Sequence, residues 1–141
     1  MDLDTVLPRF ADSLHPQGKL AIVSQVESDT PWSDELGRLI VRYSSNHDDH
    51  RYGLFPRIVD EGYYRPDRFL RTAPVPTTQT VPDYLESLPS RSGLARHRMA
   101  DPDGFDAEVS SLLSRHAVDG LLRFRVIGQL GWGRPVARHV R

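Results

Sequence analysis

The 141-residue chain has no cysteine, a single lysine and no long hydrophobic run. Without cysteine it can form no disulfide, no thiolate nucleophile and no cysteine-ligated zinc or iron–sulfur centre. No apolar stretch approaches the roughly 18 residues needed to span a bilayer, and the acidic N-terminus is not typical of a signal peptide. These absences lead us to expect a soluble cytoplasmic protein.

An excess of charge of either sign is also missing, because 18 basic residues nearly balance 19 acidic ones. Nucleic-acid and membrane partners, which select strongly basic surfaces, are therefore not expected. Lys19 is the one lysine, and we attribute the predominance of arginine to codon usage in a GC-rich genome rather than to phosphate binding. The length is that of one domain, so we predict a single domain over residues 1–141.

Alternating helix and strand patterns predict an α/β fold. An apolar stripe at helical spacing over Leu3–Leu14 predicts a helix that begins near Asp4 or Thr5, since Pro8 is tolerated only in a first turn. Leu20–Val23 has no polar face, as expected of a strand covered by helices on both sides. Strands are also predicted at Arg68–Thr72 and Leu121–Leu130, together with a proline-spaced connector at Ala73–Thr78 and a flexible tail over residues 134–141. The other predicted helices are Pro31–Ser45, Phe55–Glu61, Val81–Leu88 and Pro102–His116.

Residues that favour helix ends support these boundaries. Thr30 before Pro31 and Asp101 before Pro102 are typical of N-caps followed by proline, and the run from Thr80 to Asp83 resembles a capping box. Gly62 is expected to end the helix before it.

Three segments together resemble class I, Rossmann-like, S-adenosylmethionine-dependent methyltransferases. Leu14–Leu20, with the sequence LHPQGKL, resembles the L-x-P-G-G-x-L turn before the fifth strand of that family. Val59–Tyr63 resembles the x-x-x-A-G-F approach to its sixth strand. Thr80–Leu85 followed by Ser90–Ser92 resembles the lid segment of its small-molecule branch.

The resemblance implies a partial Rossmann-like sheet with lid helices inserted. Leu20–Val23 and Arg68–Thr72 would be the equivalents of strands 5 and 6. Leu121–Leu130 would be the antiparallel strand 7, slotted between them. The implied activity is methyl transfer to a small molecule. The resemblance places the acceptor near the lid, so its candidate substrate-binding residues are Tyr84, Ser90, Arg91 and Ser92. No catalytic residue is assigned, because methyl transfer depends mainly on aligning the nucleophile with the sulfonium.

The cofactor-binding motif of that family is missing from the sequence. The family holds the methyl donor at a glycine-rich turn after its first strand, with an acidic residue at the end of the second. No such turn precedes Leu14, and Gly128, Gly131 and Gly133 come at and beyond the last predicted strand with no helix after them. We therefore expect a C-terminal, substrate-facing half that binds no S-adenosylmethionine alone and is inactive by itself. The alternative is a non-catalytic binding or interaction module derived from a methyltransferase.

The missing half would leave the outer edge of Leu20–Val23 exposed. An apolar strand edge is a site of unwanted pairing. We therefore expect that a homodimer or a partner chain covers it, or that the chain is a fragment of a longer reading frame.

The other candidate metal-binding or substrate-binding residues are better explained by structural roles. His47 and His50 with Asp48 and Asp49 could ligate a metal, but no third ligand is evident and we favour a solvated loop. His15 is interpreted as a histidine at a helix C-terminus, favoured by the helix dipole. Trp32 and Tyr43 fall in the segment that the resemblance assigns to the acceptor, but their positions on an apolar stripe favour the core.

Overall fold

The computed structural model describes residues 3–44, 54–88 and 96–136. Within these ranges the chain forms four strands, five α-helices and a short 3-10 helix, which confirms the α/β class. The elements in chain order are α1 (Leu3–Ser13), β1 (Leu20–Ser28), α2 (Ser33–Tyr43), α3 (Leu54–Asp60), β2 (Tyr64–Arg71), β3 (Val75–Thr80), α4 (Val81–Ser87), η2 (Arg96–Arg98), α5 (Pro102–His116) and β4 (Leu121–Pro135).

The chain divides into two compact units, and the single domain predicted over residues 1–141 stays a prediction. Unit 1 comprises Met1–Val26, Asp49–Ala73 and Ile127–Arg141, and unit 2 comprises Glu27–Asp48 and Pro74–Val126. Both units therefore draw on β1 and on β4.

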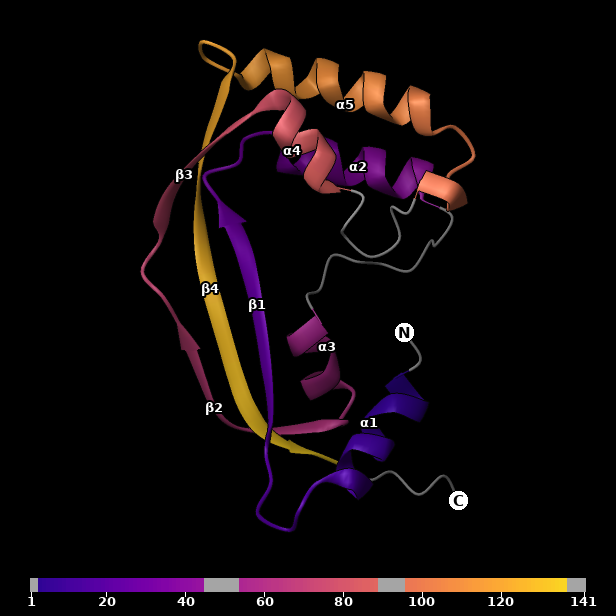
Figure 1. Cartoon of the computed structure of the whole chain (residues 1–141), viewed down its shortest axis with the longest axis vertical. Coiled ribbons are helices and arrows are strands. Elements are labelled where there is room, and N and C mark those ends of the chain that lie inside the picture. The colour runs from indigo at the N-terminus through magenta and orange to yellow at the C-terminus, as the bar shows by residue number, and fades with distance from the viewer. Residues whose placement is uncertain (1–2, 45–53, 89–95, 137–141) are drawn as a thin grey trace. The chain divides into compact units, whose positions relative to one another are not determined.

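Strand β4 is the inner strand of the sheet. The strand order is β1-β4-β2, and β3 also pairs with β4 (Figure 1). Both β2 and β3 run antiparallel to β4, β2 against its later residues and β3 against its first six. The predicted placement of Leu121–Leu130 as an antiparallel strand between the other two is confirmed. That these strands belong to a Rossmann-like methyltransferase sheet stays a prediction.

The proline-spaced connector was predicted wrongly, because part of it forms β3. Pro76 pairs with Arg125 and Thr78 with Arg123 in a regular antiparallel register. Proline cannot donate a ladder hydrogen bond, so it is tolerated in a strand only where its nitrogen faces away from the partner. Strand β3 has β4 as its partner and can accommodate Pro76 at this edge.

Strand β4 continues through Gly131 and Gly133 to Pro135, so Arg134 and Pro135 do not belong to the predicted tail. Residues 137–141 lie outside the described residues. A side chain at position 133 would place its Cβ 2.1 Å from the carbonyl oxygen of Arg65, and one at 131 would place it 2.1 Å from the Phe55 ring. These glycines therefore permit close approach within unit 1.

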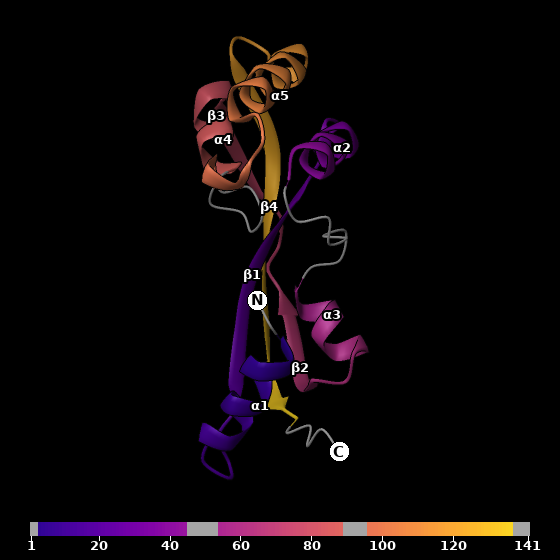
Figure 2. The same cartoon turned by 90° about the vertical axis from the view of Figure 1, so that its right-hand side faces the viewer.

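Unit 1 packs α1, α3 and the Tyr63–Tyr64 pair around one small core, made of Leu3, Leu7, Ile58, Tyr63 and Tyr64. The turn at Gly62 is the predicted helix end: its φ is +75°, and the N–H of Tyr63 bonds to the carbonyl of Ile58. This pattern is a Schellman motif. Figure 2 shows α3 beside β2. Helix α1 includes Leu3, one residue before the predicted start, which leaves Pro8 in its second turn.

Strand β1 is less covered than predicted. It extends to Ser28, but the side chains of Ala21 and Val23 are exposed to solvent, that of Val23 by 77%. The strand lies at the end of the β1-β4-β2 order, so within the described residues its second edge has no neighbour. The prediction of burial on both faces is therefore wrong for this structure, and the expectation that another chain covers its edge stays a prediction.

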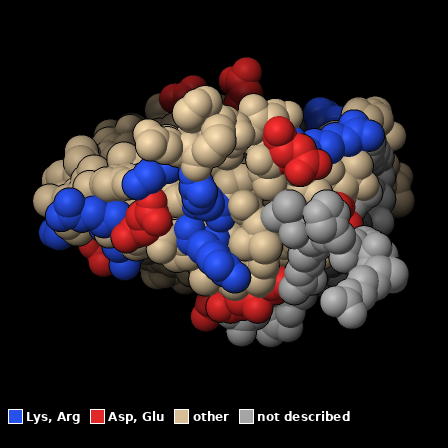
Figure 3. Space-filling model, turned by 90° about the horizontal axis from the view of Figure 1, so that it is seen from below, with Lys and Arg blue, Asp and Glu red and all other residues tan. Residues whose placement is uncertain are grey.

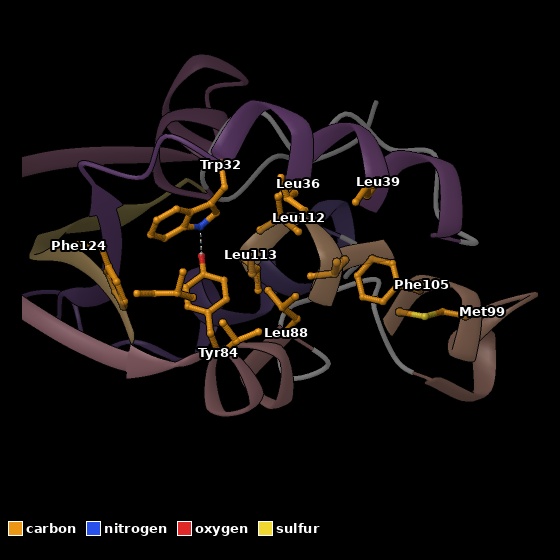
Figure 4. Packing of buried hydrophobic residues seen from close by; sticks show 13 residues of the cluster. Trp32, Leu36, Leu39, Tyr84, Leu88, Met99, Phe105, Leu112, Leu113 and Phe124 are labelled. Carbon is orange, nitrogen blue, oxygen red and sulfur yellow. Dashed lines mark hydrogen bonds between the residues drawn. The ribbon is translucent and has the colours of Figure 1, made fainter. Parts of the chain in front are cut away.

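Unit 2 packs α2 and α4 against α5 around a larger core (Figure 4). The apolar stripe of α5 is buried as predicted, apart from half-buried His116. The core consists of Trp32, Leu36, Leu39, Val81, Tyr84, Leu88, Met99, Phe105, Val109, Leu112, Leu113, Leu122 and Phe124.

Two of the three predicted N-caps of unit 2 are confirmed. The Thr80 hydroxyl accepts from the N–H of Asp83 at 3.2 Å, and the Asp101 carboxylate accepts from that of Gly104 at 2.9 Å. The prediction for Thr30 is wrong, because α2 begins later, with Trp32 at the N-cap and no side-chain cap bond. Thr30 instead starts a turn, its carbonyl accepting from the N–H of Ser33.

A pair of glycine substitutions tests the assignment of residue 133 to a tightly packed strand. We expect Gly133→Ala to destabilise the protein by about 1–3 kcal/mol, because the added Cβ overlaps backbone that cannot move aside. Gly37→Ala is the matched control, since nothing lies within 4 Å of its added Cβ. In the middle of α2 it should stabilise by about 0.5–1 kcal/mol. Urea unfolding followed by circular dichroism measures both, and equal effects would contradict the assignment.

Candidate functional site

Of the four predicted substrate-binding residues, the structure places Tyr84. Ser90, Arg91 and Ser92 lie outside the described residues, as do His47 and its neighbours through His50, the possible metal ligands. Among the residues that are described, no group of three or more His, Cys, Asp or Glu side chains could hold a metal ion.

Tyr84 lies in the core of unit 2 with its hydroxyl hydrogen-bonded on both sides. The side chain is 1% exposed. Its hydroxyl accepts from the indole N–H of Trp32 at 3.2 Å (Figure 4) and donates to a carboxylate oxygen of Glu27 at 2.5 Å. The hydroxyl is thus occupied by protein partners. A direct role for Tyr84 in substrate binding stays a prediction.

We call these three hydrogen-bonded side chains (Trp32, Tyr84, Glu27) the Trp–Tyr–Glu relay. Each of them comes from a different helix, strand or helix cap. Glu27 is the second-last residue of β1, Trp32 is the N-cap of α2, and Tyr84 lies in the first turns of α4. The cap at Thr80 and Pro82 fixes where α4 begins and hence which way Tyr84 faces.

Aromatic contacts hold the relay in one geometry. The Trp32 and Tyr84 rings meet edge to face with centroids 5.8 Å apart, and Phe124 packs edge-on against both, at 6.2 and 5.6 Å. Edge-to-face packing is a favoured arrangement of aromatic rings. His116 also approaches Trp32, with centroids 5.9 Å apart. Trp32 is 2% exposed, which confirms its assignment to the core.

The direction of hydrogen bonding in the relay follows from chemistry. An indole nitrogen can only donate, so the Tyr84 oxygen accepts from Trp32 and its one proton is directed to Glu27. The proton of the Tyr84 hydroxyl is therefore directed to the half-buried Glu27 carboxylate. Sequence reasoning missed Glu27, although its place at the carboxyl end of a strand that leads into a helix was a usable signal.

Tyr43 connects α2 to α5. Its hydroxyl donates to Glu108 at 2.7 Å and accepts from Arg42 at 3.2 Å, and Arg42 also pairs with Glu108. Hydrogen bonds from Tyr43 and then from Arg42 lower the pKa of Glu108, and the bond to Glu108 raises the pKa of Tyr43. The Tyr43 ring packs against Phe105 with centroids 5.5 Å apart. These contacts favour a structural role for Tyr43.

Two shallow hollows lie apart from the relay. In unit 2, a hollow of about 270 Å³ lies over the β3–β4 pair, where Arg125 bonds to Asp29 at 3.1 Å. In unit 1, a hollow of about 110 Å³ lies beside the exposed His15, whose Nδ1 accepts from the N–H of Gln17 at 3.3 Å. Both hollows are open to solvent. The first is lined by charges of both signs and the second mainly by apolar and weakly polar groups, so each is a weaker candidate for a binding site than the relay.

The surface shows no segregation of charge on the face drawn in Figure 3, where basic and acidic side chains lie close to one another. Ion pairs such as Lys19 with Asp67 (2.7 Å) and Arg115 with Glu35 (2.7 Å) show the same mixing. None of the helices in the described part of the chain is long and apolar enough to cross a bilayer.

No protein-family model matches the chain, and no curated protein is significantly similar to it. Function is therefore inferred from the strand topology and from the geometry of the relay.

Removal of the Tyr84 hydroxyl tests the relay as a structural unit. We expect Tyr84→Phe to destabilise the protein by about 1–3 kcal/mol, because it leaves the buried indole N–H of Trp32 without that acceptor. Tyr43→Phe is the control, since it removes an exposed hydroxyl and should cost clearly less. Thermal unfolding of both variants measures the difference. A larger loss for Tyr43→Phe would contradict the arrangement described.

The lowered pKa of Glu108 predicts a pH-dependent contribution to stability. A carboxyl group whose folded pKa lies below its ordinary value of 4.5 stabilises the fold above that pH, and the contribution is lost as the pH falls through the folded pKa. We expect Glu108→Gln to lower the urea midpoint at pH 7 and to have a smaller effect near pH 3. Glu86→Gln, on the exposed side of α4, is the control. An effect of Glu108→Gln that is independent of pH would contradict the assignment.

Proposed function

We propose that this chain is the C-terminal, substrate-facing half of an S-adenosylmethionine-dependent methyltransferase fold that acts on a small molecule. The observation that carries the proposal is the strand order β1-β4-β2, with β4 antiparallel to β2. The resemblance predicted this arrangement from three short segments of the sequence.

The elements between β1 and β4 support a substrate-facing role. Helices α2 and α4 follow the ends of β1 and β3, and the relay joins both helices to the carboxyl end of β1. In the Rossmann-like sheet that the resemblance implies, ligands bind outside the carboxyl ends of the parallel strands, and Glu27 would lie at one of these ends. Ser90, Arg91 and Ser92 remain the proposed lid residues around the acceptor, and the buried Tyr84 would support the lid without touching the acceptor.

The residues present do not fit S-adenosylmethionine itself. The nearest approach to a glycine-rich motif is Gly128, Gly131 and Gly133, which lie within β4 instead of between a strand and a helix. At 131 and 133 the space a side chain would need is taken by Phe55 and by the Arg65 backbone. We therefore propose that the methyl donor is held by a separate cofactor-binding half.

The edge of β1 is the proposed site at which that half pairs with this chain. Its apolar residues are open to solvent, with Val23 77% exposed. Exposed, apolar strand edges readily accept another strand. A partner chain that supplies the strand is the arrangement we favour, and a homodimer formed through the same edge is the alternative.

Titration calorimetry with S-adenosylmethionine tests the proposal. We expect no micromolar binding to the chain alone. We expect micromolar binding when the chain is co-expressed with the polypeptide encoded directly upstream of it and purified as a complex. Val23→Lys, which places a charge in β1, should prevent that complex, whereas Val41→Lys on an exposed position of α2 should not.

Two results would overturn this proposal. Micromolar binding by the chain alone would show that the cofactor assignment is wrong. A purified complex that does not bind S-adenosylmethionine would favour the non-catalytic binding module.

A further inference from the structure

We propose that one face of the unit 1 sheet docks an acidic, amphipathic segment of a partner protein. We call this surface the open face. It has an apolar centre with arginines around it, and it consists of Val23, Leu130, Trp132, Arg65, Arg68 and Arg134. A partner docked there covers the face of the sheet and not the edge of β1, so this interaction is distinct from the strand pairing proposed above.

The register of β2 against β4 places the three arginines on one face of the sheet. Residues directly opposite each other in an antiparallel pair point to the same side, and alternate residues of a strand share a side. Arg65 lies opposite Arg134, and Arg68 lies opposite Trp132. Since Leu130, Trp132 and Arg134 alternate along β4, all five side chains emerge on the same face.

Helices α1 and α3 lie on the opposite face of this sheet (Figure 1). In β4, Gly131 faces the Phe55 ring of α3. In β1, Ile22 packs against the core that α1 and α3 form. The next residue along each strand therefore points away from the helices, and in β1 this residue, Val23, is 77% exposed.

The centre of the open face is apolar and accessible. The Ser24 hydroxyl donates to the Gln129 side chain at 3.2 Å, so the adjacent Val23 and Leu130 lie at the same level of the sheet. Leu130 and Trp132 are each half-buried and present part of their surface to solvent. Tryptophan is among the residues that contribute most at protein interfaces, so this centre suits the apolar side chains of a partner.

The arginines of the open face indicate the charge of the partner. Elsewhere in unit 1, Lys19 pairs with Asp67 at 2.7 Å. Among all residues that the structure describes, no acidic side chain pairs with Arg65, Arg68 or Arg134. Like charges directly opposite each other destabilise a sheet, and Arg65 and Arg134 are such a pair. The open face therefore fits a partner that supplies negative charge.

The combination of apolar and basic side chains favours a protein segment over other anions. Single-stranded nucleic acid binds to successive aromatic rings on which its bases stack, whereas the open face has one such ring, that of Trp132. A small inorganic anion would leave the apolar centre uncovered. A helix with acidic residues beside an apolar stripe satisfies both the arginines and the centre.

An amphipathic peptide of about 20 residues, with leucines along one helical face and glutamates beside them, tests the proposal on the purified chain. Two matched peptides replace every glutamate by lysine or every leucine by serine, and oligothymidine of equal charge represents nucleic acid. The signals are the indole N–H resonances of the two tryptophans in ¹H–¹⁵N spectra, which Trp132→Phe assigns. Trp32 is the internal reference, because it is buried in unit 2.

We expect the acidic peptide to shift the Trp132 resonance in a saturable way and to leave that of Trp32 unchanged. The lysine peptide should not bind, because it repels the arginines. The serine peptide should bind about tenfold more weakly or less, because it lacks the apolar contact. Added salt should weaken binding of the acidic peptide.

Substitutions then test the residue assignments. Arg134→Gln should weaken binding of the acidic peptide about threefold or more, and the double variant with Arg68→Gln about tenfold or more. Arg123→Gln should leave the affinity unchanged and is the matched control, since Arg123 is an exposed arginine of β4 that lies opposite Thr78 in unit 2. Arg134→Gln relieves repulsion from Arg65, so its thermal unfolding midpoint should be unchanged or raised, which separates lost binding from lost folding.

Four outcomes would overturn the proposal. These are no shift with the acidic peptide, equal affinity for the acidic and the lysine peptide, full affinity in the double variant, and tighter binding of oligothymidine than of the acidic peptide. Neither S-adenosylmethionine nor a second polypeptide is present in these experiments, so such a failure is separate from a failure of the proposed methyl transfer.

Discussion

Strand β4 is the constraint on which the rest of this structure depends. It pairs with β3 through its first residues and with β2 through its later ones, and β1 lies on its other side. Both compact units draw on it. Such a strand must tolerate neighbours on two edges and packing on its faces. Gly131 and Gly133 meet this requirement in unit 1, where a side chain would overlap Phe55 or Arg65.

The second constraint is the satisfaction of buried polar groups in unit 2. Trp32 and Tyr84 bring an indole N–H and a hydroxyl into a core of leucine, valine and phenylalanine. An unpaired polar group there would be costly. The indole N–H is paired with the Tyr84 hydroxyl, and that hydroxyl is paired with the Glu27 carboxylate. None of the buried side-chain nitrogen and oxygen atoms of the described residues is left without a partner. The same bonds that stabilise the core therefore also orient a half-buried carboxylate.

Local patterns in the sequence predicted the helices well, because helical periodicity and end signals are carried by neighbouring residues. The caps at Thr80 and Asp101 and the C-terminal glycine Gly62 are such signals. Strands were harder to predict. The ladder of β3 with β4 joins residues more than forty positions apart, and its prolines suggested a connector. Likewise, the glycines of β4 suggested a chain end, because the close approach that requires them is not visible in the sequence.

The candidate site was only partly predictable. Tyr84 was identified through the lid resemblance, but its hydrogen-bond partners come from two other elements, so the relay could not be foreseen. Glu27 was missed because a lone acidic residue after an apolar run has many possible roles. Only the fold shows that it receives the Tyr84 hydroxyl.

The central claim is that β1 is an unpaired edge at which a cofactor-binding half joins this chain. Residue-resolved amide hydrogen exchange of the chain alone, and then of the complex, measures this most directly. The account predicts slow exchange along β4 and fast exchange at those alternate β1 amides that face away from it. It predicts that the fast amides become protected in the complex. Uniform protection along β1 in the isolated, monomeric chain, or no gain of protection in the complex, would contradict it.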